Sequence, residues 1–269
     1  MDIFSAIILG LVQGVTEFLP ISSSGHLILV REFFEQSASN TLAFDAILHL
    51  STTLAIIIYF WSDIWVLMQA VVRKLGRLPV NEKDLILLYA LLIGTIPAVI
   101  LGFFLETILE KYLSTPIIVA IVLFLGATFF MYAEWRYYVK PPQGSLTLRR
   151  GILIGCFQAL ALIPGLSRSG STLAGGMLLG LSRIESARFS FLLAIPITLG
   201  IGAKKLLELI VLGGEVSWGP IMIGAAVSFV VALIVIHFFL AFIRKYTLWP
   251  FIWYSIVLSL FVGYFALFG

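Results

Sequence analysis

Residues 151–181 have the sequence GILIGCFQALALIPGLSRSGSTLAGGMLLGL, in which a polar stretch rich in Gly, Pro and Ser interrupts an apolar run. The apolar parts before and after this stretch are each shorter than the roughly 20 residues that a helix needs to cross a bilayer. Two short helices joined by such a turn are typical of a re-entrant hairpin, which returns to the side of the membrane that it entered. Residues 3–30 have the same organisation, with the interruption at Pro20 and the serines that follow it. The sequence therefore predicts two re-entrant helical hairpins.

The composition predicts that lipid surrounds most of the chain. Of the 269 residues, 61% are hydrophobic and 12% are charged, and the mean hydropathy is +1.09. A soluble domain carries about 25% charged residues, and a fold of this size could not hide so much apolar surface from water. Six further stretches are apolar and long enough to span: 42–61, 86–106, 116–134, 187–211, 218–243 and 248–268. We therefore expect an all-α polytopic membrane protein with six transmembrane helices and two re-entrant hairpins.

The two hairpins match each other at a constant offset of 145 residues, without a gap. The matched pairs are Gly10 with Gly155, Gln13 with Gln158, Ser22 with Ser167, Ser24 with Ser169, and Gly25 with Gly170. The register continues into the next span, where Phe44, Leu48, Thr53 and Leu54 meet Phe189, Leu193, Thr198 and Leu199. Apolar composition alone gives scattered Leu matches but not a matched Ser-x-Ser-Gly. We interpret this as an internal duplication within a single membrane domain (1–269), with repeats of approximately 1–135 and 146–269.

The basic residues predict the orientation of the chain. Three spans separate the two copies, so the second copy is inverted relative to the first. One set of loops holds twelve basic residues: Arg73, Lys74, Arg77, Lys83, Arg136, Lys140, Arg149, Arg150, Arg183, Arg188, Arg244 and Lys245. The other set holds Arg31, Lys111, Lys204 and Lys205. Because Lys and Arg are enriched in cytoplasmic loops, we expect both termini outside, the first hairpin entering from outside and the second from the cytoplasm.

Ionisable residues within the membrane usually mark a functional site, because burying them in lipid costs several kcal/mol. Glu17, His26 and Arg168 are the strongest candidates, since hydroxyl residues and glycines flank them. For Asp45 and His49, a site role and a place at the membrane interface stay equally open. His237 is expected to be an interfacial or packing residue, and Cys156, within an apolar segment, a buried thiol.

The second interruption, Pro164 to Thr172, has the composition of an anion-binding loop. Pro164 and Gly165 predict a tight turn, and the helix that follows presents free backbone N–H groups and the positive end of its dipole. Arg168 offers a planar fork that suits two phosphate oxygens. The hydroxyl donors of this loop are Ser167, Ser169 and Thr172. A serine-rich helix cap is the simpler alternative, but a cap needs no arginine inside the membrane.

The first interruption supplies groups that the arginine loop lacks. Glu17 is a carboxylate, Ser22, Ser23 and Ser24 are candidate nucleophiles or donors, and His26 lies three residues beyond Ser23. A carboxylate would repel a diphosphate unless a divalent cation bridges the two, so we expect Mg²⁺ or Ca²⁺ held by Glu17 and substrate oxygens. Gln13, four residues before Glu17 and thus on the same helix face, is the further metal ligand considered. One loop that binds and one that attacks together indicate phosphoryl transfer.

These two loops resemble the bacterial undecaprenyl-diphosphate phosphatase family, also called bacitracin-resistance proteins. The motifs are Glu17-Phe18-Leu19-Pro20 followed by Ser22-Ser23-Ser24-Gly25-His26, and Pro164-Gly165-Leu166-Ser167-Arg168-Ser169-Gly170-Ser171-Thr172. The resemblance covers essentially the whole chain. It implies hydrolysis of undecaprenyl diphosphate to the monophosphate carrier of cell-wall synthesis, at a metal-dependent site that faces the extracytoplasmic side of the inner membrane.

Roles follow from the resemblance residue by residue. Glu17 is similar to the family's metal- or water-positioning carboxylate and Arg168 to its phosphate clamp. Ser23 and His26 resemble the nucleophile and base, and the sequence does not decide which of them attacks phosphorus. The supporting substrate-binding residues are Ser22, Ser24, Gly165, Ser167, Ser169 and Thr172.

Two other classes of function remain as alternatives. Inverted repeats with broken helices are typical of transporters, so a flippase for a polyprenyl phosphate would use the same cavity. A lipid-binding scaffold would use the polar loops for structure alone. The expected partners are the polyprenyl diphosphate substrate and membrane lipids, with a homodimer left open. The small net charge of +3 and the scattered basic residues give no reason to expect nucleic acid.

Overall fold

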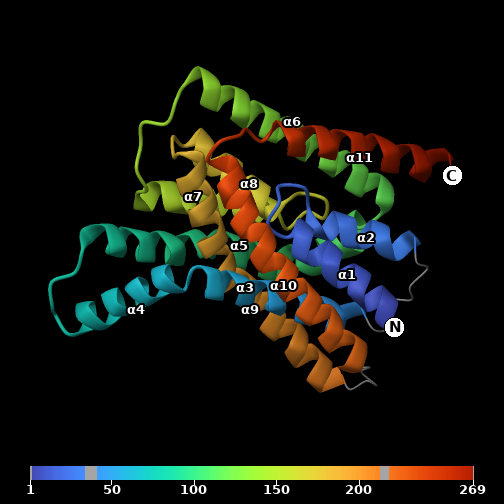
Figure 1. Cartoon of the computed structure of the whole chain (residues 1–269), viewed down its shortest axis with the longest axis horizontal. Helices are drawn as coiled ribbons and strands as arrows, with labels where there is room; N and C mark the ends of the chain where they lie inside the picture. Colours follow the sequence, from blue (N-terminus) through green and yellow to red (C-terminus); the bar gives the residue numbers. More distant parts are fainter. Residues whose placement is uncertain (1, 34–40, 213–217, 269) are drawn as a thin grey trace.

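The computed structural model describes residues 2–33, 41–212 and 218–268, and all regular structure within them is helical (Figure 1). These residues form α1 (Ile3–Thr16), α2 (Ser23–Phe33), α3 (Thr41–Tyr59), α4 (Trp61–Leu75), α5 (Glu82–Leu113), α6 (Pro116–Val139), α7 (Leu148–Leu160), α8 (Arg168–Leu178), α9 (Arg183–Leu212), α10 (Trp218–Ile243) and α11 (Trp249–Phe268). The all-α class is therefore confirmed.

Both interrupted segments are pairs of short helices, as the sequence predicts. The helices α1 and α2 have 14 and 11 residues, and α7 and α8 have 13 and 11. None of them reaches the roughly 20 residues of a full span. That each pair returns to the side it entered stays a prediction.

Five helices in the described part of the chain are long and apolar enough to cross a membrane, and α3 with α4 makes a sixth if this bent pair is one span. The sequence predicts one span over 42–61, and at the end of this stretch the chain turns by 78° between α3 and α4. At the bend, the buried ring of Phe60 packs against Phe191, and Asp63 in the first turn of α4 forms an ion pair with Arg188 of α9. The helix α3 therefore covers almost all of the predicted span, and the bend lies at its end, where the sequence did not predict the further helix α4.

Glycine-to-glycine contacts fix two helix crossings. A Cβ atom at Gly10 of α1 would lie 2.3 Å from the carbonyl oxygen of Gly224 in α10. A Cβ atom at Gly155 of α7 would lie 2.0 Å from the carbonyl oxygen of Gly94 in α5. Small residues let membrane helices approach closely. Gly10 and Gly155 are matched at the offset of 145 residues, whereas their partners Gly224 and Gly94 are not, so the duplication stays a prediction.

The helices α3 and α9 also cross at matched residues. The hydroxyl of Thr53 donates to the hydroxyl of Thr198 over 2.7 Å, and these two threonines are 145 positions apart. The helices α6 and α11 lie side by side along another face (Figure 1).

Ion pairs join the helices near the ends of the predicted spans. Arg183 of α9 pairs with the buried Glu134 of α6 and covers the ring of Tyr137, with 4.1 Å between guanidinium carbon and ring centroid. Arg31 of α2 pairs with Asp45 of α3. Asp45 therefore has a structural partner.

Large apolar side chains remain uncovered on the outer helix faces, as a lipid-facing surface requires. Phe103 of α5 and Phe268 of α11 are 82% and 76% exposed. Cys156 is also exposed on α7, so the expectation of a buried thiol is wrong. The segment around Cys156 is apolar on both faces of α7, one packed against the protein and the other exposed on its outer surface.

Candidate active site

The two interruptions meet inside the molecule. The hydroxyl of Ser169 donates to the carbonyl oxygen of Leu19 over 3.0 Å, and Ser167 donates to the same oxygen over 3.4 Å. The two serine hydroxyls are 3.1 Å apart. These bonds hold the arginine loop, residues 161–167 and the start of α8, against the turn that joins α1 to α2.

Matched serines start the second helix of each pair. The hydroxyl of Ser167 accepts from the backbone N–H of Gly170 over 3.1 Å, and that of Ser22 accepts from Gly25 over 3.3 Å. Both are the helix-capping bonds that Ser makes readily. Ser22 has φ of 68°, a left-handed conformation that is uncommon for a residue with a side chain. Such strain persists where the surrounding structure holds it, often at functional sites.

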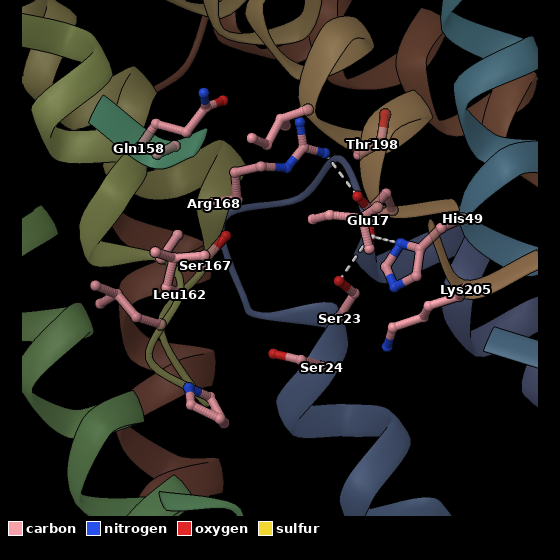
Figure 2. Close-up of a pocket in the computed structure, with 16 residues that line it drawn as sticks. Glu17, Ser23, Ser24, His49, Gln158, Leu162, Ser167, Arg168, Thr198 and Lys205 are labelled. Atoms are coloured by element: carbon pink, nitrogen blue, oxygen red, sulfur yellow. Dashed lines mark hydrogen bonds and ion pairs between the residues drawn. The ribbon is translucent and has the colours of Figure 1, made fainter. Parts of the chain in front are cut away.

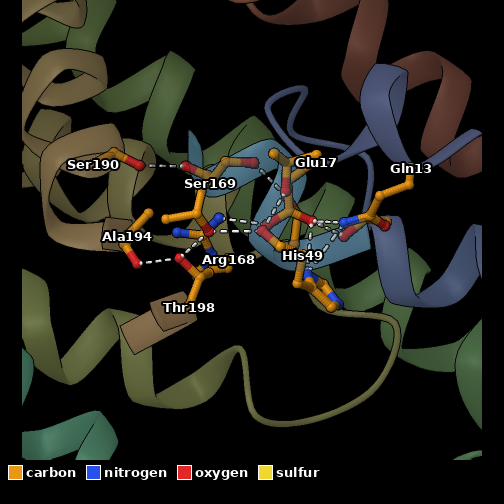
Figure 3. Close-up of polar contacts among 12 residues, drawn as sticks. Gln13, Glu17, His49, Arg168, Ser169, Ser190, Ala194 and Thr198 are labelled. Atoms are coloured by element: carbon orange, nitrogen blue, oxygen red, sulfur yellow. Dashed lines mark hydrogen bonds and ion pairs between the residues drawn. The ribbon is translucent and has the colours of Figure 1, made fainter. Parts of the chain in front are cut away.

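Glu17 is the centre of the polar network (Figure 3). Its Oε1 accepts from a guanidinium nitrogen of Arg168 over 2.6 Å. Its Oε2 accepts from the hydroxyl of Ser23 over 2.7 Å and from Nε2 of Gln13 over 2.9 Å. Nδ1 of His49 lies 3.7 Å from the same Oε2 and 3.1 Å from Nε2 of Gln13. A buried carboxylate needs this partnership with a cation and several donors, because an unpaired charge there would be very costly.

A cavity of about 190 Å³ opens beside this network (Figure 2). The predicted site residues that line it are Glu17, Ser23, Ser24, Ser167 and Arg168. Pro164 and Leu166 of the arginine loop also line it, while Ala98, Leu162, Ile197 and Ile201 give it an apolar side. Residues from five separate stretches of the chain thus converge on one polar pocket.

Four other predicted residues are not among the described residues that line the pocket: Ser22, Gly165, Ser169 and Thr172. Ser22 and Ser169 make the loop contacts described above. The hydroxyl of Thr172 donates to the carbonyl oxygen of Arg168 over 2.8 Å and lies beside the hydroxyl of Ser190 in α9. Gly165 has φ of +96°, and a Cβ there would lie 3.0 Å from the carbonyl oxygen of Val119. In this structure these four residues shape the loops.

His26 is not brought together with Ser23. Its Nδ1 lies 2.7 Å from the carbonyl oxygen of Ser22, and its Nε2 lies 2.7 Å from the hydroxyl of Tyr254 in α11. The two rings are stacked with their centroids 5.7 Å apart. The hydroxyl of Ser23 pairs instead with Glu17. His237 also lies outside the site, with its Nδ1 3.4 Å from the hydroxyl of Tyr59.

Four polar residues of the described pocket lining were not predicted as site residues: His49, Gln158, Thr198 and Lys205. The sequence marked His49 as an ionisable residue within a span, with a site role and a place at the membrane interface both open. Its contact with Glu17 places it at the site. Gln158 is matched to Gln13 by the repeat, which was the one signal for it in the sequence. Thr198 and Lys205 come from α9, where nothing local distinguishes a pocket residue from any other.

The donor set limits how a metal ion could be held. Within residues 2–33, 41–212 and 218–268, no three His, Cys, Asp or Glu side chains gather closely enough to form a metal site. Among the described residues that line the pocket, Glu17 is the one carboxylate. Oε1 of Gln13 is buried without a hydrogen-bond partner. These groups fit a divalent cation whose remaining ligands are substrate oxygens and water, as Mg²⁺ commonly has.

The arrangement suits nucleophilic attack on an anionic group. A serine hydroxyl donates to a carboxylate that can accept its proton. An arginine fork and the N-terminus of α8, whose first residue is Arg168, lie on the other side to bind the anion. Hydroxyl groups of Ser24 and Ser167 add donors around the same cavity.

Comparison with known proteins agrees with this chemistry. Residues 6–261 match the family described as bacitracin resistance protein BacA. The chain is similar to proteins named undecaprenyl-diphosphatase from Trichlorobacter lovleyi (43% identity, 100% of this chain and 98% of the relative), Alteromonas mediterranea (41%, 96% and 97%) and Micrococcus luteus (39%, 96% and 95%). With its five or six candidate spans it is a multi-pass protein of the bacterial inner membrane. The chain belongs to the BacA family of bacitracin resistance proteins.

Proposed function

We propose that this protein is a phosphatase that hydrolyses undecaprenyl diphosphate to undecaprenyl phosphate and inorganic phosphate, and so recycles the lipid carrier for cell-wall synthesis. The observation that carries the proposal is the bond of 2.7 Å from the hydroxyl of Ser23 to Glu17, next to the Glu17–Arg168 ion pair. The names of the relatives support the choice of substrate.

Substrate binding prepares the carboxylate for its role. The terminal phosphate enters the pocket and bonds to Arg168, which then divides its positive charge between the phosphate and Glu17. Because an opposite charge stabilises an ionised carboxylate, Glu17 becomes a stronger base as Arg168 turns to the phosphate. The substrate thus activates the group that must deprotonate Ser23.

The reaction then proceeds in two steps. The Ser23 oxygen attacks the terminal phosphorus while its proton passes to Glu17, and the bond from that phosphorus to the bridging oxygen breaks. The lipid monophosphate leaves with the proton. Water next attacks the phosphoserine, and Glu17 takes the water proton and returns it to the Ser23 oxygen as inorganic phosphate departs. Arg168 and the N–H groups at the start of α8 stabilise the charge of both transition states.

His26 has a positioning role in this scheme. Both of its ring nitrogens are engaged, with the carbonyl oxygen of Ser22 and with Tyr254. Through these bonds it holds the strained turn that precedes Ser23. Ser23 rather than His26 is therefore the proposed nucleophile.

A divalent cation, Mg²⁺ or Ca²⁺, would be held by Glu17 and Gln13. When bound, it would neutralise phosphate charge and polarise the phosphoryl oxygens. The buried and unpartnered Oε1 of Gln13 supports this assignment.

We also propose that the active site faces the extracytoplasmic side and that the protein is built as an inverted repeat with both termini outside. The distribution of Lys and Arg among the loops supports the orientation. The contact between the matched residues Thr53 and Thr198 supports the repeat, as do the tight helix crossings at the matched residues Gly10 and Gly155.

The test is phosphate release from undecaprenyl diphosphate by the purified protein in detergent, with and without EDTA. Ser23→Ala should reduce kcat by at least about 10³-fold, the scale seen when a nucleophile is removed. The control is Ser51→Ala, because that hydroxyl donates to Leu48 within its own helix and does not line the pocket. Unchanged release by Ser23→Ala would exclude Ser23 as the nucleophile. No release by a folded wild type would refute the phosphatase and direct the next measurement to lipid transport in liposomes.

A further inference from the structure

Two cationic side chains line the described part of the pocket, and the proposed mechanism uses one of them. Among the described lining residues, Glu17, Arg168 and Lys205 carry a full charge. Arg168 and Glu17 form an ion pair with 2.6 Å between nitrogen and oxygen. Lys205 is thus a second cation at the pocket besides Arg168, although it lies within an apolar helix that qualifies as a membrane span.

Lys205 belongs to the wall that α9 contributes. Thr198, Ile201 and Lys205 all line the pocket, and their spacing places them on one face of the helix. Thr198 is anchored by its bond to Thr53, and Lys205 lies about 10 Å further along the helix axis at a rise of 1.5 Å per residue. Figure 2 shows Ser23 between Arg168 and Lys205. The two cations thus occupy different parts of the cavity.

We propose that Lys205 binds the proximal phosphate of the substrate, the one esterified to the lipid, while Arg168 binds the terminal phosphate. The inference rests on the proposed phosphatase function. A diphosphate brings two anionic groups into a low-dielectric site, and each needs a donor or a cation. A Lys ammonium is a mobile point charge that suits a phosphate.

The apolar side of the pocket gives this assignment a direction. Ala98, Leu162, Ile197 and Ile201 line the same cavity, so the first isoprene unit can leave between α5, the arginine loop and α9. Ile201 lies one turn from Lys205 on the same helix face. The phosphate attached to the lipid therefore lies beside Lys205 while the terminal phosphate reaches Ser23.

The repeat shows that this cation belongs to one half only. At the offset of 145 residues, Lys205 corresponds to Phe60, which is buried against Phe191 in an aromatic cluster. Likewise Arg168 corresponds to Ser23, and Glu17 to Leu162. The second half thus provides both phosphate-binding cations, and the first half provides the nucleophile and the carboxylate.

The test compares Lys205→Met with Lys204→Met. Lys204 is the neighbouring residue, is exposed and does not line the pocket, so it is the matched control for loss of one positive charge. We expect Lys205→Met to raise KM for a polyprenyl diphosphate about 10- to 100-fold, the range for a hydrogen bond to a charged group. Its kcat should change by less than about threefold, and Lys205→Arg should restore most of the KM.

Inhibition by products separates the two subsites. Inorganic phosphate, the product of the terminal site, should inhibit Lys205→Met as strongly as it inhibits the wild type, which also shows that the pocket is folded. A polyprenyl monophosphate, whose phosphate lies at the proximal site, should inhibit Lys205→Met at least about 10-fold more weakly than it inhibits the wild type. Equal KM values for the Lys205→Met and Lys204→Met variants would overturn the proposal.

A binding measurement tests the assignment of Lys205 independently of catalysis. A polyprenyl diphosphate analogue with a methylene bridge should bind the wild type at least about 10-fold more tightly than Lys205→Met. If that analogue binds both equally, Lys205 is not a phosphate ligand. If the wild type binds it but hydrolyses no diphosphate, the proposed function fails and the Lys205 assignment is judged on binding alone. Should Lys205→Met not fold, Lys205→Gln replaces it with the same criteria.

Discussion

Gln158 buries a carboxamide for which neither Nε2 nor Oε1 has a hydrogen-bond partner, although the residue lines the pocket and is 2% exposed. Its counterpart Gln13 is equally buried but donates to Glu17. An unpaired buried polar group costs about 1–3 kcal/mol. That cost is unexplained by the fold alone, and a polar substrate or water in the cavity would offset it.

The two glutamines therefore make a matched pair for mutation. Gln158→Leu should leave the melting temperature in detergent unchanged or higher, because it removes unsatisfied groups, while kcat/KM falls about 10-fold through the lost substrate contact. Gln13→Leu should destabilise the protein by about 1–3 kcal/mol, because it removes a donor from Glu17. Equal destabilisation by both changes, with full activity of Gln158→Leu, would show that Gln158 has only a structural role.

Replacement of Arg168 by lysine, the other residue with a permanent positive charge, should lower the activity. Lysine keeps the charge but not the planar fork that contacts Glu17 and a phosphate together. We expect Arg168→Lys to lower kcat/KM about 10²- to 10³-fold, as for removal of an oxyanion donor, and Arg168→Ala to lower it further. Phosphate release measured over substrate concentration gives both values. Wild-type kinetics in Arg168→Ala would exclude the clamp, and Arg136→Lys, which lies outside the pocket, is the control.

At the scale of helices, the crossings of α1 with α10 and of α7 with α5 depend on missing side chains. Gly155→Ala would place a Cβ 2.0 Å from a backbone oxygen of Gly94, which has no rotamer to change. We expect the helices to separate at a cost of about 1–3 kcal/mol or more. Gly200→Ala in α9 meets nothing within 4 Å and should be neutral or stabilising. Thermal unfolding in detergent compares the two, and equal melting temperatures would contradict the tight crossing.

Predictability from sequence also differs among the elements. The helix α10 has the predicted bounds 218–243 because an uninterrupted apolar run has one interpretation in lipid. The helix α4 was not predicted. Its first turn is held by the ion pair of Asp63 with Arg188 of α9, a contact that no local pattern in the sequence indicates. Glu17, Ser23 and Arg168 could be predicted as site residues from the residues next to them in the sequence. Lys205 and His49 enter the pocket through the packing of α3 against α9, which no local pattern specifies.

At the scale of the whole molecule, the proposed orientation makes a prediction about both termini and the loops. An inverted repeat built from six crossings puts the C-terminal end of α11 on the side opposite to the loop between α6 and α7. In a Cys156→Ser background, Leu267→Cys should react with a membrane-impermeant maleimide added to intact spheroplasts. Arg149→Cys, in the first turn of α7, should react only after the membrane is opened.

The same experiment can separate six crossings from five. If the bent pair of α3 and α4 does not cross, the number of spans is odd and the two ends of the protein lie on opposite sides. A cysteine at Ile3, which is 53% exposed at the start of α1, would then differ in labelling from one at Leu267. Labelling of both from outside fits six crossings and an extracytoplasmic entrance to the pocket. Labelling of Arg149→Cys in intact spheroplasts would show that the orientation is the reverse of the proposed one. The diphosphate would then have to reach the site from the cytoplasm.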